Sequence, residues 1–485
     1  MEFIDYHFCL CYKLTVFYGM QQFLKIHRQT PAKRSVQERI LDYNEISKKY
    51  DEVVARQQAS RCIQCGNPGC EFECPLGNYI LDWLRHVSKG NLKEALNSTR
   101  STNTFPEICG RICPQDRLCE MNCVINFIEE GAVTIGAIEA WIQDKAKENG
   151  IVYATKRQSS NGVKVAVIGS GPGGLACADE LNQLGYEVTV FEQASQAGGL
   201  MMFGIPNFKL DKNLITERIN QFKTYGIQFK FNAAMGRDFT LQDLKAKGFQ
   251  AIFLAFGAYQ AKMVSIASFD SKFVHEALPY LVQTNKMNLN LSFEKKDEIL
   301  IKDKDVVVLG GGDTAMDCVR TSIRKGARSV TCVYRRDRNN MPGSQAEVTH
   351  AMEEGVKFLF LANAVDLKEE DNHAILTLEK MKLGDPDHSG RRSVEKTGEC
   401  FDLNADVILM AYGFDVERYQ LFEDMGIKTH KDGKIITNEQ GETSVSGVFA
   451  GGDCVRGASL VVWAIRDGRD ISVNIHNYLK SKKKS

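Results

Sequence analysis

The chain has 485 residues, 43% of them apolar, and its 61 basic residues are balanced by 61 acidic ones. This length provides enough apolar surface for about three domains, each with its own core. The balanced charge does not indicate binding to nucleic acid or to an anionic membrane surface. The sequence has no signal peptide and no apolar run of roughly 18 residues or more, so we expect a cytoplasmic protein with reduced thiols.

Residues 1–34 are predicted to form an N-terminal extension. Residues 1–19 are aromatic-rich, and they are either a true extension or the result of a start assigned too far upstream. Cys9 and Cys11 are therefore not assigned to a metal. From Ser35, a Ser-x-x-Glu capping box with Glu38 opens helical sequence that continues toward Arg61.

Eight cysteines between Cys62 and Cys123 form two runs, Cys-x2-Cys-x4-Cys-x3-Cys-Pro and Cys-x3-Cys-Pro-x4-Cys-x3-Cys. Thiolates are soft ligands that select iron–sulfur clusters, zinc or copper(I), and a run that closes in Cys-x3-Cys-Pro is typical of two adjacent [4Fe–4S] clusters. Disulfides are disfavoured because nothing indicates secretion, whereas the cysteines alone leave structural zinc open. Amphipathic segments at 80–87 and 91–98 predict a mostly helical cluster domain over residues 35–155.

A dinucleotide-binding fingerprint follows the cysteines. The apolar strand from Val165 ends in Gly169-x-Gly171-x-x-Gly174, a small-residue helix follows over 175–184, and a second strand over 187–191 ends in Glu192. The glycines permit a tight turn and close approach of a pyrophosphate, the helix N-terminus faces the phosphates, and the acid reaches a ribose hydroxyl. Strand, helix and terminal acid together make this a strong prediction.

The unit then repeats with a different ending. A buried strand from Asp305 leads into Gly310-x-Gly312-Asp313-Thr314-Ala315, and the second strand, over 329–334, ends in Arg335 and Arg336 instead of an acid. An acid would repel a 2′-phosphate, whereas arginine binds it with a planar charged fork. The first unit is therefore predicted to bind FAD and the second NADPH.

Further motifs identify a family. The turn Gly451-Gly452-Asp453 follows a short apolar strand and precedes helical sequence over 460–468, as in two-dinucleotide flavoprotein reductases, where the Asp lies near the flavin. Gly198-Gly199-Leu200 with Gly204-Ile205-Pro206, the stretch 334–343 and Leu460-Val461-Val462-Trp463-Ala464 resemble the small (beta) subunit of bacterial NADPH-dependent glutamate synthase. The same architecture is similar to the N-terminal half of dihydropyrimidine dehydrogenase.

The resemblance implies how the cysteines divide between two clusters. One cluster takes the first cysteine set, Cys62, Cys65, Cys70 and Cys123. The other takes the second cysteine set, Cys74, Cys113 and Cys119, with one more ligand. The related dehydrogenase has a Gln at the position of Glu139, so Glu139 is predicted as that ligand, with Cys109 as the rival.

The predicted fold is α/β, with the helical iron–sulfur domain followed by two Rossmann-like dinucleotide-binding domains. Motif order predicts that the NADPH domain is inserted in the FAD domain. The expected boundaries are 156–298 for the first part of the FAD domain, 299–412 for the NADPH domain and 413–485 for the second FAD part.

The resemblance implies an electron conduit in which the cofactors carry the hydride chemistry and no acid–base side chain is required. The sequence has no N-terminal Cys nucleophile and no (β/α)8 pattern for FMN, so a large glutaminase/FMN subunit is the expected partner in a hetero-oligomer. The alternatives are the NADPH-binding subunit of a ferredoxin:NADP transhydrogenase or of a pyrimidine reductase, with another electron acceptor. An interaction protein with an inactive reductase fold is a third, disfavoured by the intact fingerprints.

Overall fold

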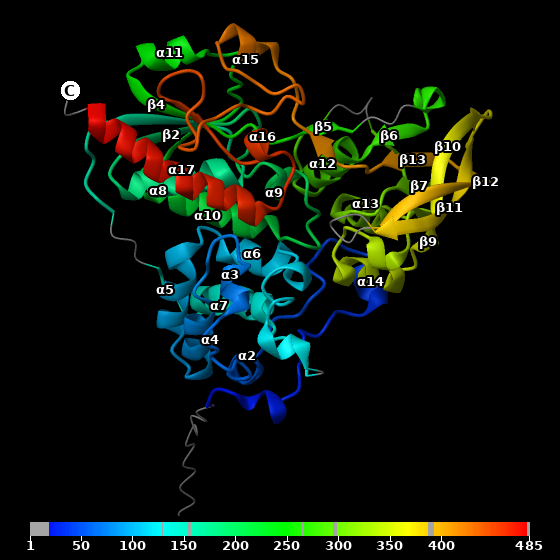
Figure 1. The fold of residues 1–485 in the computed structure, drawn as a ribbon, viewed down its shortest axis with the longest axis horizontal. Helices are drawn as coiled ribbons and strands as arrows, with labels where there is room; N and C mark the ends of the chain where they lie inside the picture. The colour runs from blue at the N-terminus through cyan, green and yellow to red at the C-terminus, as the bar shows by residue number, and fades with distance from the viewer. Residues whose placement is uncertain are drawn as a thin grey trace, which may run out of the picture.

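The computed structural model describes residues 19–128, 130–153, 157–262, 266–293, 298–386 and 392–482. These residues form a helical region below two units that each contain a parallel sheet (Figure 1). Most of the predicted N-terminal extension, including Cys9 and Cys11, lies outside the described residues.

The helical region carries both cysteine runs. Its helices and short 3-10 turns are η1 (Gln22–Leu24), α1 (Val36–Arg39), α2 (Glu52–Ser60), α3 (Gly69–Phe72), α4 (Ile80–Ser88), α5 (Leu92–Thr102), α6 (Pro106–Ile112), η2 (Gln115–Arg117), η3 (Val124–Phe127) and α7 (Ile135–Glu148). The amphipathic segments predicted at 80–87 and 91–98 correspond to α4 and α5. Trp83 and Leu84 of α4 are almost completely buried, so its apolar face forms part of the core of this region.

The predicted capping box is present, but the helix it opens is short. Ser35 Oγ accepts a hydrogen bond from Glu38 N at 3.3 Å, and the Glu38 carboxylate accepts one from Ser35 N at 3.2 Å. Helix α1 ends at Arg39, and the next helix begins at Glu52 with Asp51 as its N-cap. The prediction of continuous helical sequence to Arg61 is therefore wrong for 40–51. The Arg39 side chain, 1% exposed, bonds instead to Glu353 and Glu354 far along the chain.

The first unit is built on a five-stranded sheet with the order β15-β4-β1-β2-β3. Its strands are β1 (Lys164–Ile168), β2 (Glu187–Phe191), β3 (Gln228–Lys230), β4 (Phe249–Leu254) and β15 (Val448–Ala450), and all their pairings are parallel. Its helices are α8 (Pro172–Gln183), α9 (Leu200–Phe203), α10 (Lys212–Thr224), α11 (Leu241–Ala246), α15 (Gln420–Asp424), α16 (Asp453–Arg456) and α17 (Val461–Lys482). The C-terminal part of the chain thus contributes one strand and the long helix α17, which crosses this unit beside α8 (Figure 1).

The second unit has its own five-stranded parallel sheet, with the order β6-β13-β7-β8-β9. Its strands are β6 (Val274–Glu276), β7 (Asp305–Leu309), β8 (Ser329–Tyr334), β9 (Lys357–Phe360) and β13 (Val407–Met410). Its helices are η4 (Ala267–Phe269), α12 (Ala277–Asn288), α13 (Asp313–Arg324), η6 (Arg338–Asn340) and α14 (Gln345–Glu353). An antiparallel meander of β10 (Ala362–Glu369), β11 (Ala374–Pro386) and β12 (Arg392–Ala405) flanks this sheet.

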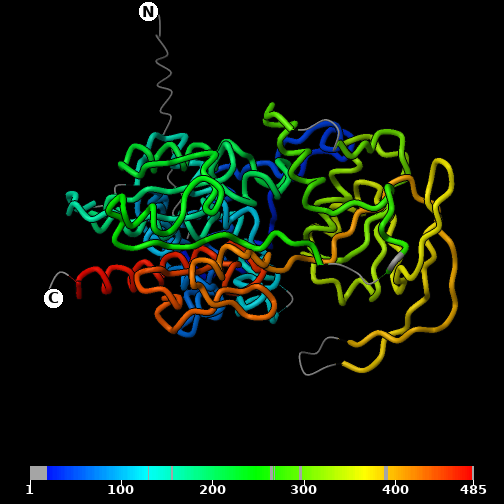
Figure 2. The backbone as a smooth tube through the Cα atoms, turned by 90° about the horizontal axis from the view of Figure 1, so that it is seen from above, coloured from blue at the N-terminus to red at the C-terminus, as the bar shows by residue number. Residues whose placement is uncertain are grey.

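The two units are joined by two segments that pair with each other. After β4 the chain forms β5 (Gln260–Ala261), and after β13 it forms β14 (Phe414–Asp415). These short strands are antiparallel partners, and Lys262 N also donates to Gly413 O at 3.0 Å. The two connections therefore lie side by side between the units (Figure 2).

The chain passes from the first sheet to the second before the expected boundary between residues 298 and 299. Strand β6 and helix α12 lie within 156–298, yet β6 pairs with β13 of the second sheet. The crossing between sheets therefore follows β5. Gly257 stands shortly before this crossing, but a three-residue edge strand such as β6 has too few positions to show a period, so the sequence did not assign it to the second sheet.

Helix α6 links the helical region to the first unit. Its residues Ile108 and Cys109, with the preceding Phe105, belong to the same buried core as Val165 and Val167 of β1. The rings of Phe105 and Phe222 meet edge to face with their centroids 5.9 Å apart. Cys113 of the second cysteine set packs against this shared core, whereas Cys74 and Cys119 pack against the core of the helical region, which also contains Cys62 and Cys70 of the first set.

Candidate functional site

The glycine loop after β1 requires residues without a side chain. Gly169 has φ of +99°, and a Cβ there would lie 2.3 Å from the carbonyl oxygen of Ala255. A Cβ at Gly174 would lie 2.1 Å from the Gly169 oxygen, whereas a Cβ at Gly171 would meet nothing within 4 Å. Helix α8 therefore packs tightly on the loop, while open space remains at Gly171, where a phosphate would approach.

Glu192 follows β2 directly and is 7% exposed. Its carboxylate accepts hydrogen bonds from Ser170 N at 3.0 Å, from Ser170 Oγ at 2.5 Å and from Ala194 N at 2.8 Å. These donors hold the Glu192 carboxylate in place at the strand end, beside the glycine loop. This is the position at which an acid binds a ribose hydroxyl.

The segment from Gly198 to Leu200 crosses the same loop. Gly199 has φ of +54°, and a Cβ there would lie 2.9 Å from Gly171 Cα. Gly198 N donates to the Ser170 carbonyl oxygen and to Ser170 Oγ, both at 3.1 Å. Leu200 begins α9 at this crossing. Close backbone approach thus explains why glycine is needed here.

The Gly-Gly-Asp turn brings a buried carboxyl to the first unit. Gly452 has φ of +74°, and the Oδ1 atom of Asp453 is buried with no hydrogen-bond partner among the described residues. Burial, followed by the nearby Asp467, raises the pKa of Asp453 to about 7. A buried polar atom without a partner is costly, so Asp453 fits a site that is completed by a bound polar group.

Helix α17 packs on α8, the helix that follows the first glycine loop. A Cβ at Gly468 would lie 2.1 Å from the Gly173 carbonyl oxygen, and a Cβ at Gly173 would lie 3.0 Å from the Ala464 oxygen. This close contact fixes the C-terminal helix, with Leu460 and Trp463 at its start, against the first glycine loop. The C-terminal helix and the first glycine loop, which are far apart in the sequence, therefore lie side by side.

The second glycine loop has the same form. Gly310 has φ of +141°, and a Cβ there would lie 2.3 Å from the Ala411 oxygen, whereas a Cβ at Gly312 would meet nothing within 4 Å. Gly312 is the N-cap of α13, Asp313 and Thr314 begin the helix, and Ala315 is completely buried. The predicted residues of this glycine loop, from Gly310 to Ala315, therefore lie together around the open N-terminus of α13.

The two arginines that follow β8 point to different surroundings. Arg335 is exposed, whereas Arg336 is 8% exposed and its Nε donates to the backbone oxygen of Arg392 at 2.6 Å. Only Arg335 thus lies at the surface, where a 2′-phosphate could reach it. The backbone alternation at the strand end turns successive side chains to opposite faces.

We therefore predict that Arg335→Gln weakens NADPH binding while leaving NADH binding nearly unchanged. A charge-assisted contact of about 1.5–3 kcal/mol corresponds to a loss of about tenfold to over a hundredfold in affinity. Arg336→Gln is the comparison, expected to affect both nucleotides similarly through the loss of its internal bond. Titration of both variants with NADPH and NADH measures this, and equal losses for Arg335→Gln would identify a structural residue.

The first cysteine set lines a single cavity. Cys62, Cys65, Cys70 and Cys123 lie around this cavity, with apolar walls that include Leu81, Leu84 and Ile135. Burial raises the pKa of the Cys62 thiol to about 11, and burial together with Cys123 and Cys62 raises that of Cys70. Four neighbouring thiols would repel one another if all were ionised. They therefore fit a site for a cationic centre, which would lower their pKa values.

The second cysteine set gathers around Glu139 of α7. Burial and then the nearby Glu139 and Cys109 raise the pKa of Cys74 to about 11. Burial, followed by Glu120, Cys74 and Glu139, raises the pKa of Cys119. Cys113 contacts Cys109, and this contact with burial raises its pKa. The structure thus brings both candidate fourth ligands to this set.

Glu139 is 6% exposed, and burial raises its pKa to about 8. Its Oε1 accepts from Asn103 Nδ2 at 3.1 Å and from Asn78 Nδ2 at 3.5 Å. The sequence analysis missed both asparagines, because each lies in an irregular segment and belongs to no motif. They hold the carboxyl in place beside the cysteines.

We predict that Glu139→Gln alters the electron paramagnetic resonance signal of one reduced cluster, because Glu139 is the predicted fourth ligand of that cluster. Cys109→Ala is the matched variant and should leave that signal nearly unchanged. Iron and sulfide contents of both proteins provide the second measurement. A changed signal in Cys109→Ala alone would reverse the assignment.

No three His, Cys, Asp or Glu side chains among the described residues converge as ligands of a single metal ion would. In a four-iron cluster each cysteine binds a different iron, so the ligands surround the cluster instead of meeting at one point.

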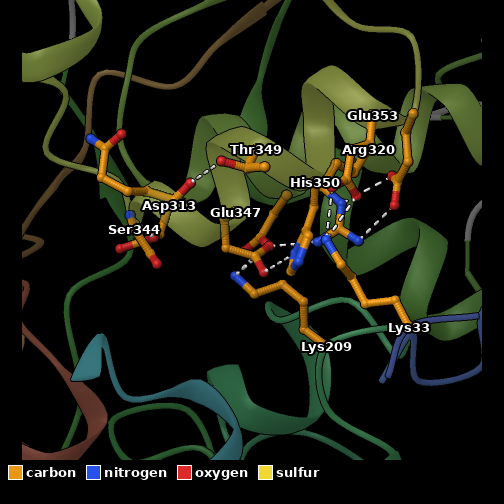
Figure 3. Close-up of polar contacts among 12 residues, drawn as sticks. Lys33, Lys209, Asp313, Arg320, Ser344, Glu347, Thr349, His350 and Glu353 are labelled. Carbon is orange, nitrogen blue, oxygen red and sulfur yellow. Dashed lines mark hydrogen bonds and ion pairs between the residues drawn. The ribbon is translucent and has the colours of Figure 1, made fainter. Parts of the chain in front are cut away.

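A buried ionic network joins the helical region and both units (Figure 3). Lys209 of the first unit lies 2.7 Å from Asp317 and 3.7 Å from Glu347 of the second. Glu347 is also 2.6 Å from Arg320, which is completely buried. Figure 3 shows Glu347 between Lys209 and Arg320.

The N-terminal segment completes this network. Lys33 lies 2.8 Å and Arg39 2.7 Å from Glu353, and Arg39 Nε lies 3.0 Å from Glu354. Glu354 also binds Arg320 and Arg324, at 2.9 and 2.7 Å. Because buried charges are stable only when paired, the network fixes how the second unit sits against the rest of the chain.

Comparison with known proteins adds the family. The NADPH glutamate synthase small chain of Escherichia coli is 43% identical, over 95% of this chain and 99% of the relative. That of Azospirillum brasilense is 44% identical, over 96% of this chain and 97% of the relative. The chain belongs to the family of glutamate synthase small chains.

Two family descriptions divide the chain as its architecture does. Residues 39–151 match the dihydropyrimidine dehydrogenase domain II with a 4Fe-4S cluster, and residues 163–468 match the pyridine nucleotide-disulphide oxidoreductases. The structure of Mycobacterium tuberculosis FprA in complex with NADPH is similar at 17% identity, with a TM-score of 0.56 over 66% of this chain and 86% of that protein. This last likeness concerns the fold alone.

The small-chain architecture also occurs within longer oxidoreductases. Escherichia coli AegA is 42% identical over 94% of this chain, but the match covers 70% of AegA. UacF of the same organism is 41% identical over 91% of this chain and 70% of the relative. The same module therefore stands next to additional sequence in those two proteins.

Across the described part of the chain, the search for a helix with the length and apolarity needed to span a bilayer found none.

Proposed function

We propose that this chain is the electron-input subunit of glutamate synthase. It oxidises NADPH with FAD and passes electrons through [4Fe–4S] clusters to a large subunit, which makes L-glutamate from L-glutamine and 2-oxoglutarate. The observation that carries the proposal is that one chain joins a cysteine-rich helical region to two glycine-loop sheets, and matches glutamate synthase small chains over nearly their full length.

FAD is assigned to the first unit. The open space at Gly171, the Glu192 carboxylate and the unpartnered Asp453 oxygen are the features that support this assignment. Gly169 and Gly174 would let the backbone approach a pyrophosphate, and Gly199 with Leu200 would cover it. Gly452 would place Asp453 toward the flavin's polar chain.

NADPH is assigned to the second unit. Gly310 and Gly312 leave the α13 N-terminus open, and Asp313, Thr314 and Ala315 form its first turn. The exposed Arg335 would bind the 2′-phosphate, while Arg336 would hold the strand end from inside. We further propose that this unit is an insertion in the FAD domain, since β15 returns to the first sheet after β13.

Two clusters are assigned to the cysteine sets. The first set, Cys62, Cys65, Cys70 and Cys123, would hold one cluster, and Cys74, Cys113 and Cys119 with Glu139 the other. Cys113 of the second set packs against the core that α6 shares with the first unit, which supports an order of flavin, second-set cluster, first-set cluster, partner.

When bound, FAD supplies the chemistry that turns the transfer of a hydride, which carries two electrons, into single-electron transfers. The clusters supply sites that each hold a single electron. The chain's residues position these groups and exclude water. Helix α6 and the Phe105–Phe222 contact would hold Cys113 of the second set beside the flavin unit. No side chain is assigned to acid–base chemistry.

The partner assignment follows from the family. The large subunit would contain the glutaminase and FMN sites, and the two subunits would form a hetero-oligomer. We place this reaction in the cytoplasm, where thiols stay reduced. The described cysteines are all free, as cluster ligation requires.

A second candidate function keeps the same conduit but changes the acceptor. The matches to AegA and UacF favour it, because those oxidoreductases contain this module beside other sequence. The chain would then serve a ferredoxin:NADP transhydrogenase or a pyrimidine reductase.

Reconstitution separates the two candidates. We predict that the purified chain oxidises NADPH with artificial acceptors and forms no glutamate from glutamine and 2-oxoglutarate. Addition of a glutamate synthase large subunit should restore glutamate formation, because that subunit supplies the missing sites. Coupling to ferredoxin or pyrimidines, with no response to the large subunit, would replace the proposal with the second candidate.

A further inference from the structure

The loop between Cys113 and Cys119 leaves the helical region and reaches the glycine loop of the second unit. Its three central residues form η2 (Gln115–Arg117). Gln115 faces inward, and Asp116 and Arg117 face the second unit. This arrangement connects the loop that carries Cys113 and Cys119 with the glycine loop of the second unit. Arg117 and Asp313, which are in contact, lie 196 residues apart in the sequence.

The inner side of the loop is firmly held. Gln115 Nε2 donates to the backbone oxygens of Cys109 at 3.4 Å and Gly110 at 3.2 Å. The Gln115 carbonyl accepts from Glu120 N at 3.0 Å and Met121 N at 3.1 Å. A Cβ at Gly136 would lie 2.2 Å from Gln115 Nε2, so the side chain also packs against α7. The loop therefore presents its outer residues from a fixed base.

The outer side contacts the second unit through two charged residues. Arg117 Nη2 donates to Asp313 Oδ2 at 3.2 Å, and Nη1 donates to the Pro342 carbonyl oxygen. Asp116 Oδ2 accepts from Gln345 N at 3.0 Å and from Ser344 Oγ at 3.3 Å. Arg117 thus binds the start of α13 and the segment before α14, and Asp116 binds Ser344 and the first residue of α14.

Those two segments are themselves joined beside the glycine loop. Ser344 N donates to Asp313 Oδ1 at 3.0 Å, and Gly343 N donates to the Gly311 oxygen at 3.0 Å. A Cβ at Gly343 would lie 3.1 Å from the same oxygen. Figure 3 shows Ser344 and Asp313 next to each other, away from the Lys209–Glu347 contact. A continuous chain of hydrogen bonds therefore runs from the 113–119 loop to the open helix N-terminus at Gly312.

We propose that Asp116 and Arg117 are positioning residues for NADPH, contributed by the iron–sulfur domain. They hold the phosphate-binding loop of the second unit in its open, binding-competent form. Because the same loop carries Cys113 and Cys119, nucleotide binding and the second-set cluster are thermodynamically linked: each changes the free energy of the other by the same amount. The inference rests on the proposed placement of NADPH and of the second-set cluster.

The first experiment measures binding without turnover. Oxidised holoprotein is titrated with NADP⁺ in wild type, Arg117→Gln, Arg117→Lys and Asp116→Asn. We expect the dissociation constant to rise by about fivefold or more in Arg117→Gln and Asp116→Asn, the lower range of coupling between linked sites. Arg117→Lys should recover part of the loss. Arg237→Gln is the matched control, since the partners of Arg237 among the described residues are the adjacent Asp238 and the Asn232 backbone, in an exposed turn of the first unit.

The second measurement reads the cluster directly. Paramagnetic resonance spectra of the reduced protein are recorded with and without NADP⁺, and flavin and iron contents verify that each variant is loaded. NADP⁺ should shift one cluster signal in wild type and in Arg237→Gln, and the shift should be lost in Asp116→Asn, which keeps the shape of the side chain.

Two results would overturn the inference, and they differ in meaning. Unchanged NADP⁺ affinity in both Arg117→Gln and Asp116→Asn, with wild type binding normally, would refute the positioning role and leave the proposed function standing. If wild type binds NADP⁺, and neither Arg335→Gln nor the Asp116 and Arg117 variants change the NADP⁺ affinity, the placement of NADPH is refuted as well.

Discussion

Cys74→Ser is expected to abolish glutamate formation by the reconstituted two-subunit enzyme. Cys74 belongs to the second cysteine set, and the pKa of its thiol responds to Glu139 and Cys109. Serine is a poor ligand for a soft iron–sulfur centre, so the cluster nearest the flavin should be lost or altered. Electrons would then reach FAD without a path to the partner. NADPH oxidation by artificial acceptors should be largely retained, because it needs only the two nucleotide sites.

The separation between the two assays is the measurement. Glutamate production with the large subunit is compared with NADPH-dependent dye reduction in the same preparation. Cys400→Ser is the matched control, since Cys400 is exposed on β12 and should leave both activities unchanged. If Cys74→Ser kept glutamate formation, or lost dye reduction to the same degree, the conduit order proposed above would be wrong.

Glu354→Ala is expected to destabilise the protein by about 3–5 kcal/mol, the usual cost of removing one partner from a buried ionic pair. Glu354 is 4% exposed and has Arg320, Arg324 and Arg39 within 3.0 Å. Although burial alone would raise its pKa, hydrogen bonds from Arg324 and Arg320 lower the pKa of Glu354 to about 2. The substitution would leave these buried guanidinium groups without their shared anion.

Urea unfolding followed by circular dichroism measures this loss. Glu399→Ala is the comparison, because Glu399 pairs with Lys380 at 2.8 Å on the exposed β11–β12 hairpin and should change stability little. NADPH oxidation should also fall in Glu354→Ala, since the network sets the position of the second unit. A stable Glu354→Ala protein with normal NADPH oxidation would show that the network is not required for this arrangement.

The local motifs could be predicted because their information lies in short stretches of sequence. Positive φ at Gly169 and Gly310, the capping box at Ser35 and the strands that lead into both loops depend on neighbouring residues alone. The cysteine spacing similarly indicated metal ligands before any contact was known. The assignment of each cysteine set, in contrast, came from resemblance to a family, and the structure now brings those cysteines together.

The sequence by itself determined the types of site: two dinucleotide loops, a cysteine-rich helical region and a charge pattern that favours NADPH. Tertiary structure decided which side chains serve them. It turned Arg336 inward and left Arg335 exposed, ended α1 at Arg39, and moved β6 into the second sheet. It also brought Asp116 and Arg117 to Asp313 and Ser344. Backbone conformation and spacing act over a few residues, whereas these contacts join segments far apart in the chain, so only the packed fold determines them.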